Sequence, residues 1–219
     1  MSCKVKVWDL PVRLFHWSLL ALVIFSWWSG TRGGDLLPLH ARSGYAILAL
    51  TLFRVAWGLA GSETALFASF VRGPRSTMAY VRSVVARRPY AYLGHNPLGG
   101  WMVLALLGCL LVQGASGLFA TDDVAFSGPL AHDLGDRAGA LVTALHKANF
   151  YVLLALVFLH IGAVLAHVAM HRDALLAAMF SGRKPAPPGT PPLRFVPTAR
   201  AAALLALAAL LVYGLTRLG

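Results

Sequence analysis

The chain has 219 residues, of which 58% are apolar and only 12% are charged, and its formal net charge is +11. Because soluble domains carry about a quarter charged residues, this composition argues against a soluble protein and for a membrane protein. The basic residues lie beside apolar segments, where they suit anionic lipid, and this placement argues against nucleic-acid binding.

Five apolar segments are each close to the roughly 20 residues that a helix needs to cross about 30 Å of hydrocarbon. In chain order they cover residues 14–30, 41–61, 99–120, 148–170 and 201–218. We therefore predict an all-α integral membrane protein, in which four transmembrane helices form a bundle and a fifth C-terminal transmembrane helix lies beside it.

The connecting segments complete this organisation. Residues 75–88 alternate basic and apolar side chains and predict a helix in the membrane interface. Residues 121–145 form a loop that carries Asp122, Asp123, Asp133 and Asp136. A Pro-rich stretch begins at Pro185 and predicts an extended linker. We expect a membrane domain over residues 1–184, a cytoplasmic linker over 185–200 and an extra helix over 201–219.

Charge placement predicts the orientation of the chain in the membrane. Basic residues precede the first segment and recur within residues 72–88 and 172–200, whereas the alternate connections carry few of them. This positive-inside bias predicts a cytoplasmic N-terminus. Tryptophans are expected in an interfacial belt, Trp8, Trp17, Trp57 and Trp101 towards the cytoplasm and Trp27 and Trp28 towards the other face.

Four histidines lie in or at the ends of these segments: His16, His40, His146 and His160. With alternating helix directions, His40 and His146 lie near the outer face. His160 follows His146 by fourteen residues, about 21 Å deeper on nearly the same side of the helix. There it approaches the depth of His16. Two pairs at two depths are what two axially ligated haems require.

Further residues fit or compete with this interpretation. Arg54 follows His40 by fourteen residues and lies at the depth of His160, where a haem propionate would pair with it, unless its guanidinium snorkels to the surface. Depth alone leaves His167 as an alternative to His160. Gly30, Gly44, Gly108, Gly114 and Gly117 either admit a flat macrocycle or serve helix packing. His95 and His132 lie in loops and are expected to be solvated.

Several motifs in order along residues 7–184 resemble those of one family. They are Val7-Trp8-Asp9-Leu10-Pro11-Val12-Arg13-Leu14-Phe15-His16-Trp17, His40 with Gly44-Tyr45, Phe53-Arg54 with Trp57-Gly58, Gly94-His95-Asn96-Pro97, Leu145-His146, Leu159-His160 and Gly182-Arg183-Lys184. This set resembles the bacterial membrane di-haem cytochrome b-561 family, which includes the b-type cytochrome subunit of nickel–iron hydrogenases.

The resemblance implies two b-type haems and their ligands. His16 and His160 would bind the inner haem iron and His40 and His146 the outer one, which favours His160 over His167, and Arg54 is a further cofactor-binding residue. It also implies a protein of the bacterial inner membrane that carries electrons between the quinone pool and a redox partner, such as a c-type cytochrome or hydrogenase. Apart from the resemblance, the four loop aspartates either steer a basic partner such as a c-type cytochrome or belong to an ordinary solvated loop.

Two other functions stay open. Some members of the family resemble enzymes that oxidise superoxide with quinone as acceptor, for which Arg42 and Lys147 would supply a cationic pocket beside His40 and His146. The second alternative is a haem-free proton-coupled transporter or membrane anchor, in which the histidines relay protons.

Overall fold

The structure is a computed structural model that describes the chain except for residues 1–2, 87–91, 123, 125, 172–173 and 219. Arg87, Arg88, Asp123 and Arg172, which belong to the predicted charge pattern, lie outside the described residues.

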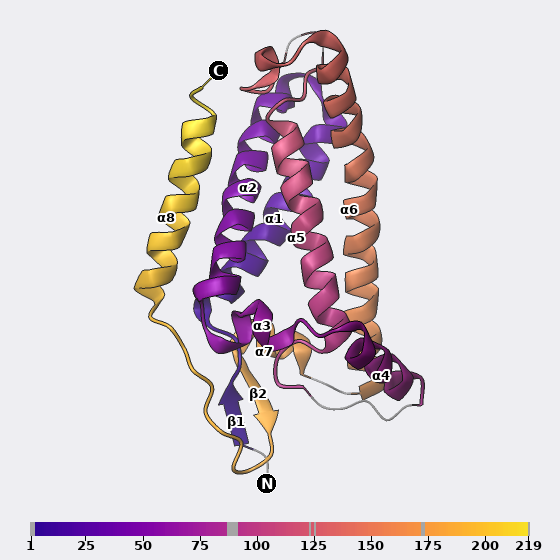
Figure 1. Ribbon diagram of the computed structural model, residues 1–219, viewed down its shortest axis with the longest axis vertical. Coiled ribbons are helices and arrows are strands. Elements are labelled where there is room, and N and C mark those ends of the chain that lie inside the picture. Colours follow the sequence, from indigo (N-terminus) through magenta and orange to yellow (C-terminus); the bar gives the residue numbers. More distant parts are fainter. Residues whose placement is uncertain (1–2, 87–91, 123, 125, 172–173, 219) are drawn as a thin grey trace.

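Five long helices dominate the described part of the chain (Figure 1). They are α1 (Leu10–Arg32), α2 (Leu37–Ala60), α5 (Pro97–Gly117), α6 (Asp136–His171) and α8 (Thr198–Leu215). All five are long and apolar enough to cross a membrane, which confirms the predicted all-α membrane bundle. The largest difference lies at α6, which begins at Asp136 instead of residue 148, so that His146 lies well inside the helix.

Short elements gather at the end of the bundle where the chain begins (Figure 1). They are α3 (Phe67–Phe70), α4 (Pro74–Val85), α7 (Leu175–Ser181) and the strands β1 (Cys3–Lys6) and β2 (Arg183–Ala186). Helix α4 matches most of the helix predicted over residues 75–88. We call this end of the bundle the sheet end and the opposite end, which carries the α1–α2 and α5–α6 connections, the loop end.

The two strands were not predicted. They pair antiparallel, with Cys3 opposite Ala186 and Lys6 opposite Arg183. The preceding glycine, Gly182, ends α7 with φ at 75°, and its carbonyl accepts the backbone N–H of Val7 at 2.8 Å. This turn brings the chain after α7 back onto the N-terminal arm, and β2 runs across the boundary expected between residues 184 and 185.

Helix packing makes α2 the centre of the molecule. Helix α1 packs on α2, α5 packs on α6, and α2 also packs on α5 and α8. Among the described residues, α1 and α6 do not form a closely packed pair. Side chains that α1, α6 and α8 turn outwards are apolar, as Leu14 at 58% and Tyr151 at 69% exposed illustrate, which suits a lipid environment.

The linker after β2 is extended but tied to the bundle. The backbone N–H of Arg194 donates to Glu63 Oε2 at 2.9 Å, and that of Val196 donates to Ser62 Oγ at 3.1 Å. Helix α8 then returns along α2, with Val212 buried against the cluster that contains Leu48. The C-terminal segment is therefore packed against the four-helix bundle along its length (Figure 1).

Two tryptophans of the predicted belt are buried inside the protein and are not exposed to lipid. Trp57 has no exposed surface and Trp8 is also buried, whereas Trp27, Trp28 and Trp101 are exposed at the ends of helices. A hydrogen bond accounts for the burial of the Trp57 indole. Its indole N–H donates to Asp9 Oδ2 at 2.9 Å, a tertiary contact between residues far apart in the sequence.

Asp9 joins the first two helices through its carboxylate. Oδ1 accepts the backbone N–H of Val12 at 2.8 Å and so caps the N-terminus of α1, while Oδ2 accepts Trp57 of α2. The carboxylate itself is buried, at 3% exposed. Because His16 lies in the second turn of α1, this contact fixes its depth relative to α2.

Replacing Asp9 tests this role. Asp9→Ala removes the cap and leaves the Trp57 N–H buried without an acceptor, so we expect a loss of about 2 kcal/mol in stability. Asp9→Asn keeps one amide oxygen and should lose less. The measurement is the thermal unfolding midpoint in detergent, with the exposed Asp35→Ala as control. Equal midpoints for Asp9→Ala and Asp35→Ala would contradict this role.

Candidate functional site

The structure brings the four membrane histidines together in two pairs. His16 of α1 faces His160 of α6 with ring centroids 6.5 Å apart, and His40 of α2 faces His146 of α6 with centroids 6.2 Å apart. The first pair lies towards the sheet end and the second towards the loop end, and we call them the sheet-end pair and the loop-end pair. The structure thus places His160 opposite His16, as the family resemblance favours.

The distances between the rings fit a shared metal ion. Two imidazoles that each bind a metal through a bond of about 2 Å have ring centres about 6 Å apart. Both pairs meet this spacing without any movement of a helix. Among the described residues, no three His, Cys or carboxylate side chains come close enough to hold a metal together. The arrangement therefore suits a metal that takes its other ligands from a macrocycle.

Hydrogen bonds orient both imidazoles of the loop-end pair. His40 Nδ1 lies 2.9 Å from the carbonyl oxygen of Ser26, and His146 Nδ1 lies 3.0 Å from that of Gln113. A carbonyl only accepts, so each Nδ1 carries the proton and donates it. This tautomer leaves a lone pair on each Nε2, which is the form that a metal-binding histidine takes.

A polar network that the sequence did not reveal surrounds His146. Ser116 Oγ lies 3.2 Å from His146 Nδ1, and the Gln113 amide lies 3.1 Å from Nε2. Asn149 donates to Gln113 Oε1 at 2.7 Å and to the carbonyl of Cys109 at 3.0 Å. One feature of the sequence could have indicated this network: Asn149 is a polar residue in an apolar segment and lies one helical turn after His146.

Glycines border both members of the loop-end pair. A methyl group at Gly30 would lie 2.8 Å from His40 Nδ1, and one at Gly117 would lie 3.0 Å from His146 Cε1. Gly114 instead packs against Leu48. A Cβ at Gly44 or Gly108 would meet nothing within 4 Å, so these two positions leave space beside the backbone.

Charged residues near the loop end differ in their accessibility. Arg42 and Lys147 are exposed beside His40 and His146. Asp122 is engaged locally, since its Oδ1 accepts the backbone N–H of Val124 at 3.1 Å and that of Phe126 at 2.8 Å. Asp133 lies 3.2 Å from the exposed His132. The steering of a partner by this loop remains a prediction, and for Asp122 a structural role is evident.

The sheet-end pair is built differently. His16 lies between two residues of α1 that bind the end of α7. Arg13 Nε donates to the carbonyl of Met179 at 3.2 Å, and Trp17 Nε1 donates to the same carbonyl at 3.4 Å. His16 Nδ1 itself is buried without a hydrogen-bond partner. The half-buried His160 completes the pair from α6.

Arg54 is buried at the sheet end and does not snorkel to the surface. Its side chain is 3% exposed, with the guanidinium carbon 5.4 Å from the centre of the Phe67 ring. Its Nη1 has no hydrogen-bond partner in the part of the chain that the structure describes. Asp9 is near enough to act on it electrostatically, but the two lie too far apart for an ion pair. A buried guanidinium with a free N–H is suited to an anion supplied by a ligand.

His95 is not solvated, contrary to the sequence prediction. Its ring packs between Trp8, at 4.8 Å, and Phe70, at 4.5 Å, and its Nδ1 is buried without a partner. Burial lowers the pKa of His95 to about 3, with Arg54, His160 and His16 adding to the effect, so its imidazole is neutral at physiological pH. Burial of this loop depends on tertiary contacts that the sequence does not display.

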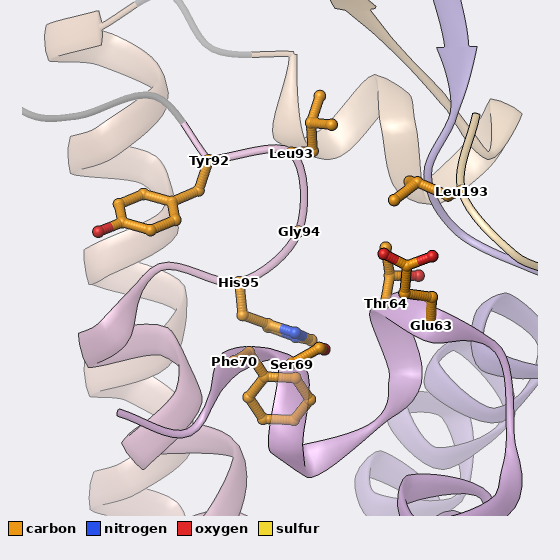
Figure 2. A pocket seen from close by; sticks show the side chains of 9 residues that line it. All are labelled: Glu63, Thr64, Ser69, Phe70, Tyr92, Leu93, Gly94, His95 and Leu193. Atoms are coloured by element: carbon orange, nitrogen blue, oxygen red, sulfur yellow. The ribbon is translucent and has the colours of Figure 1, made fainter. Parts of the chain in front are cut away.

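A pocket of about 140 Å³ opens beside His95 at the sheet end (Figure 2). Polar side chains of Glu63, Thr64 and Ser69 line it together with the rings of Phe70 and Tyr92, and Leu193 of the C-terminal linker forms part of its wall. His95 therefore lines this pocket and is also close enough to Arg54, His16 and His160 for them to act on it electrostatically.

Comparisons with known proteins agree with this geometry. The chain matches the family described as prokaryotic cytochrome b561 over residues 7–182. A probable Ni/Fe-hydrogenase B-type cytochrome subunit of Rhizobium leguminosarum bv. viciae is 23% identical over 213 residues, which cover 83% of this chain and 89% of the relative. A protein of the same description from Azotobacter vinelandii is 25% identical over 215 residues, with 81% and 87% covered. No solved structure gives a significant match.

Gly30 provides a test of the loop-end geometry. The added methyl group of Gly30→Ala would overlap the His40 ring, so we expect a loss of about 1–3 kcal/mol in stability. The control is Gly214→Ala on α8, where a Cβ meets nothing within 4 Å and a helix position should gain from alanine. Thermal unfolding midpoints compare the two variants, and an unchanged midpoint for Gly30→Ala would show that His40 lies elsewhere.

Proposed function

The chain belongs to the prokaryotic cytochrome b561 family, and we propose that it is a di-haem cytochrome that carries electrons across the bacterial inner membrane between the quinone pool and a redox partner. Membership in this family makes it a multi-pass membrane b-type cytochrome of electron transfer. The observation that carries the finer proposal is the spacing of the two histidine pairs, at 6.5 and 6.2 Å.

Haem b, when bound, supplies the one-electron redox chemistry of such a protein. In our proposal, His16 and His160 hold one haem, and His40 and His146 hold the other. A haem held by two histidines would disfavour the binding of oxygen and would suit electron transfer. The backbone carbonyls of Ser26 and Gln113 keep the loop-end imidazoles in the tautomer that this role needs.

The separation of the two histidine pairs places them at two different depths in the membrane. His146 and His160 lie on one continuous helix, about 21 Å apart along its axis. Such a separation brings one pair near each face of a bilayer whose hydrocarbon core is about 30 Å thick. A chain with one site at each depth is suited to moving electrons between the two faces.

We propose that the sheet end faces the cytoplasm. The described part of this end carries Lys4 and Lys6 in the N-terminal arm, Arg13 in the first turn of α1, and Arg72, Arg75, Arg82, Arg183, Lys184 and Arg194 in the connections between helices. The connections at the loop end carry fewer basic residues, which is the positive-inside pattern. The loop end would then meet a periplasmic partner, such as a c-type cytochrome or a hydrogenase, and the names of the two relatives support a hydrogenase.

A second function has one observation in its favour. Arg42 and Lys147 are both exposed next to the loop-end pair, where they would attract a small anion such as superoxide. Oxidation of two superoxide anions to oxygen would deliver the two electrons that, with two protons, reduce a quinone to a quinol. Turnover of superoxide by the purified protein, and its loss in Arg42→Ala with Lys147→Ala, would establish this activity.

The proposed ligands predict a pairwise response to mutation. His40→Ala or His146→Ala should each lose about half of the b-type absorbance, and the remaining half should titrate as one redox component. His16→Ala and His160→Ala should lose the other half. Reduced-minus-oxidised spectra and redox titrations of the purified variants measure this outcome.

The exposed His132 supplies the control, because His132→Ala should keep the full absorbance. If a folded single variant lost both haems, or if His40→Ala and His16→Ala lost the same component, the assignment of the pairs would be wrong.

If all five long helices span the membrane, the segments before and after α8 lie on opposite sides of it. With a cytoplasmic N-terminus, alkaline phosphatase fused after Thr190 should be inactive, because the linker lies in the cytoplasm. The same enzyme fused after residue 219 should be active, because α8 carries it to the periplasm. Equal activities of the two fusions would show that α8 does not span the membrane.

A further inference from the structure

Three buried nitrogens at the sheet end have no hydrogen-bond partner among the described residues: His16 Nδ1, Arg54 Nη1 and His95 Nδ1. Two aromatic rings link Arg54 to His95. The guanidinium carbon lies 5.4 Å from the centre of the Phe67 ring, Phe67 packs 5.8 Å from Phe70, and Phe70 packs 4.5 Å from His95. Arg54 and His16 are also close enough to help lower the pKa of His95. Buried polar groups without partners are costly and uncommon in folded proteins. Because the Arg54 guanidinium can only donate, what this cluster lacks is an acceptor.

Nothing in the described part of the chain supplies this acceptor. The nearest carboxylate to Arg54 in electrostatic terms is that of Asp9. Both of its oxygens are already engaged, Oδ1 by the N–H of Val12 and Oδ2 by the indole of Trp57. The positive charge of Arg54 thus lies in a membrane helix without a hydrogen-bonded anion, and this suits a carboxylate brought by a ligand.

Two ring contacts of His95 and two hydrogen bonds of its neighbours in the chain fix the position of this side chain. Trp8 and Phe70 hold its ring. The next residue, Asn96, caps α5 by accepting the N–H of Gly99 at 2.8 Å. Lys184 of β2 donates to the carbonyl of Tyr92 at 3.0 Å and anchors the segment that precedes His95. A solvated histidine in a loop would not need these ring contacts and hydrogen bonds to hold its position.

We propose that His95 joins Arg54 in binding a carboxylate of the haem that His16 and His160 hold. Arg54 supplies the positive charge and His95 a neutral N–H, and both bonds are of the charge-assisted kind, which are stronger than bonds between neutral groups. The inference rests on the proposed function. His95 also lines the pocket at this end of the bundle (Figure 2).

The test uses the full chain in the His40→Ala background, in which only the sheet-end haem is expected. Protein made without haem synthesis is loaded with haem b or with its dimethyl ester, which has no free carboxylate. With haem b, His95→Leu should lower the midpoint potential, because the carboxylate charge is less compensated and the ferric state is favoured. It should also release haem about tenfold faster.

With the dimethyl ester, His95→Leu should change the midpoint potential much less, since the ester oxygens carry no negative charge for His95 to compensate. His95→Gln keeps an N–H donor and should recover most of the wild-type potential. His132→Leu, at the opposite end, should match the parent protein with either ligand.

Each other outcome overturns the inference in a recognisable way. An equal shift with haem b and with the ester would mean that His95 acts through packing alone. An unchanged potential in His95→Leu would mean that it does not contact the carboxylate. If His95→Leu does not fold, equal potentials for haem b and the ester in the parent protein contradict the inference. Wild-type chain without any haem would instead refute the proposed function itself.

Discussion

The interval of fourteen residues between His146 and His160 on α6 sets the dimensions of the rest of the molecule. Because α6 is one continuous helix, the interval fixes two sites about 21 Å apart on nearly the same side. Helices α1 and α2 each need to bring only one histidine to the matching depth. The contact of Asp9 with Val12 and Trp57 sets the depth of α1, and α2 is held at the centre of the bundle by its neighbours.

The two sites satisfy their polar groups in different ways. At the loop end, backbone carbonyls and a Gln113–Asn149 network engage the imidazoles, so this pair is oriented by the protein alone. At the sheet end, His16, Arg54 and His95 keep buried nitrogens without partners. Since an unpaired buried donor is costly, the sheet end is the part of the fold that gains most from a bound anion.

The features that depend on the length of apolar segments and on helical spacing were predicted from the sequence. Apolar length identified the five spans, and helical spacing placed His16 with His160 and His40 with His146 at shared depths. The sequence missed what depends on contacts between distant segments. Trp57 is buried because Asp9 accepts its N–H, and the β1–β2 pair forms because Gly182 turns the chain back onto its start. His95 was assigned to solvent because no local pattern reveals that Trp8 and Phe70 enclose it.

The central claim is that each histidine pair holds one haem, and the most direct measurement is the haem content of the purified chain. A pyridine haemochrome assay gives the amount of haem b, and amino-acid analysis gives the amount of protein. The geometry of the two pairs predicts about two haems of the b type per chain. A folded chain that contains no haem after production under haem-replete conditions would contradict the account and leave the four histidines to packing or proton transfer.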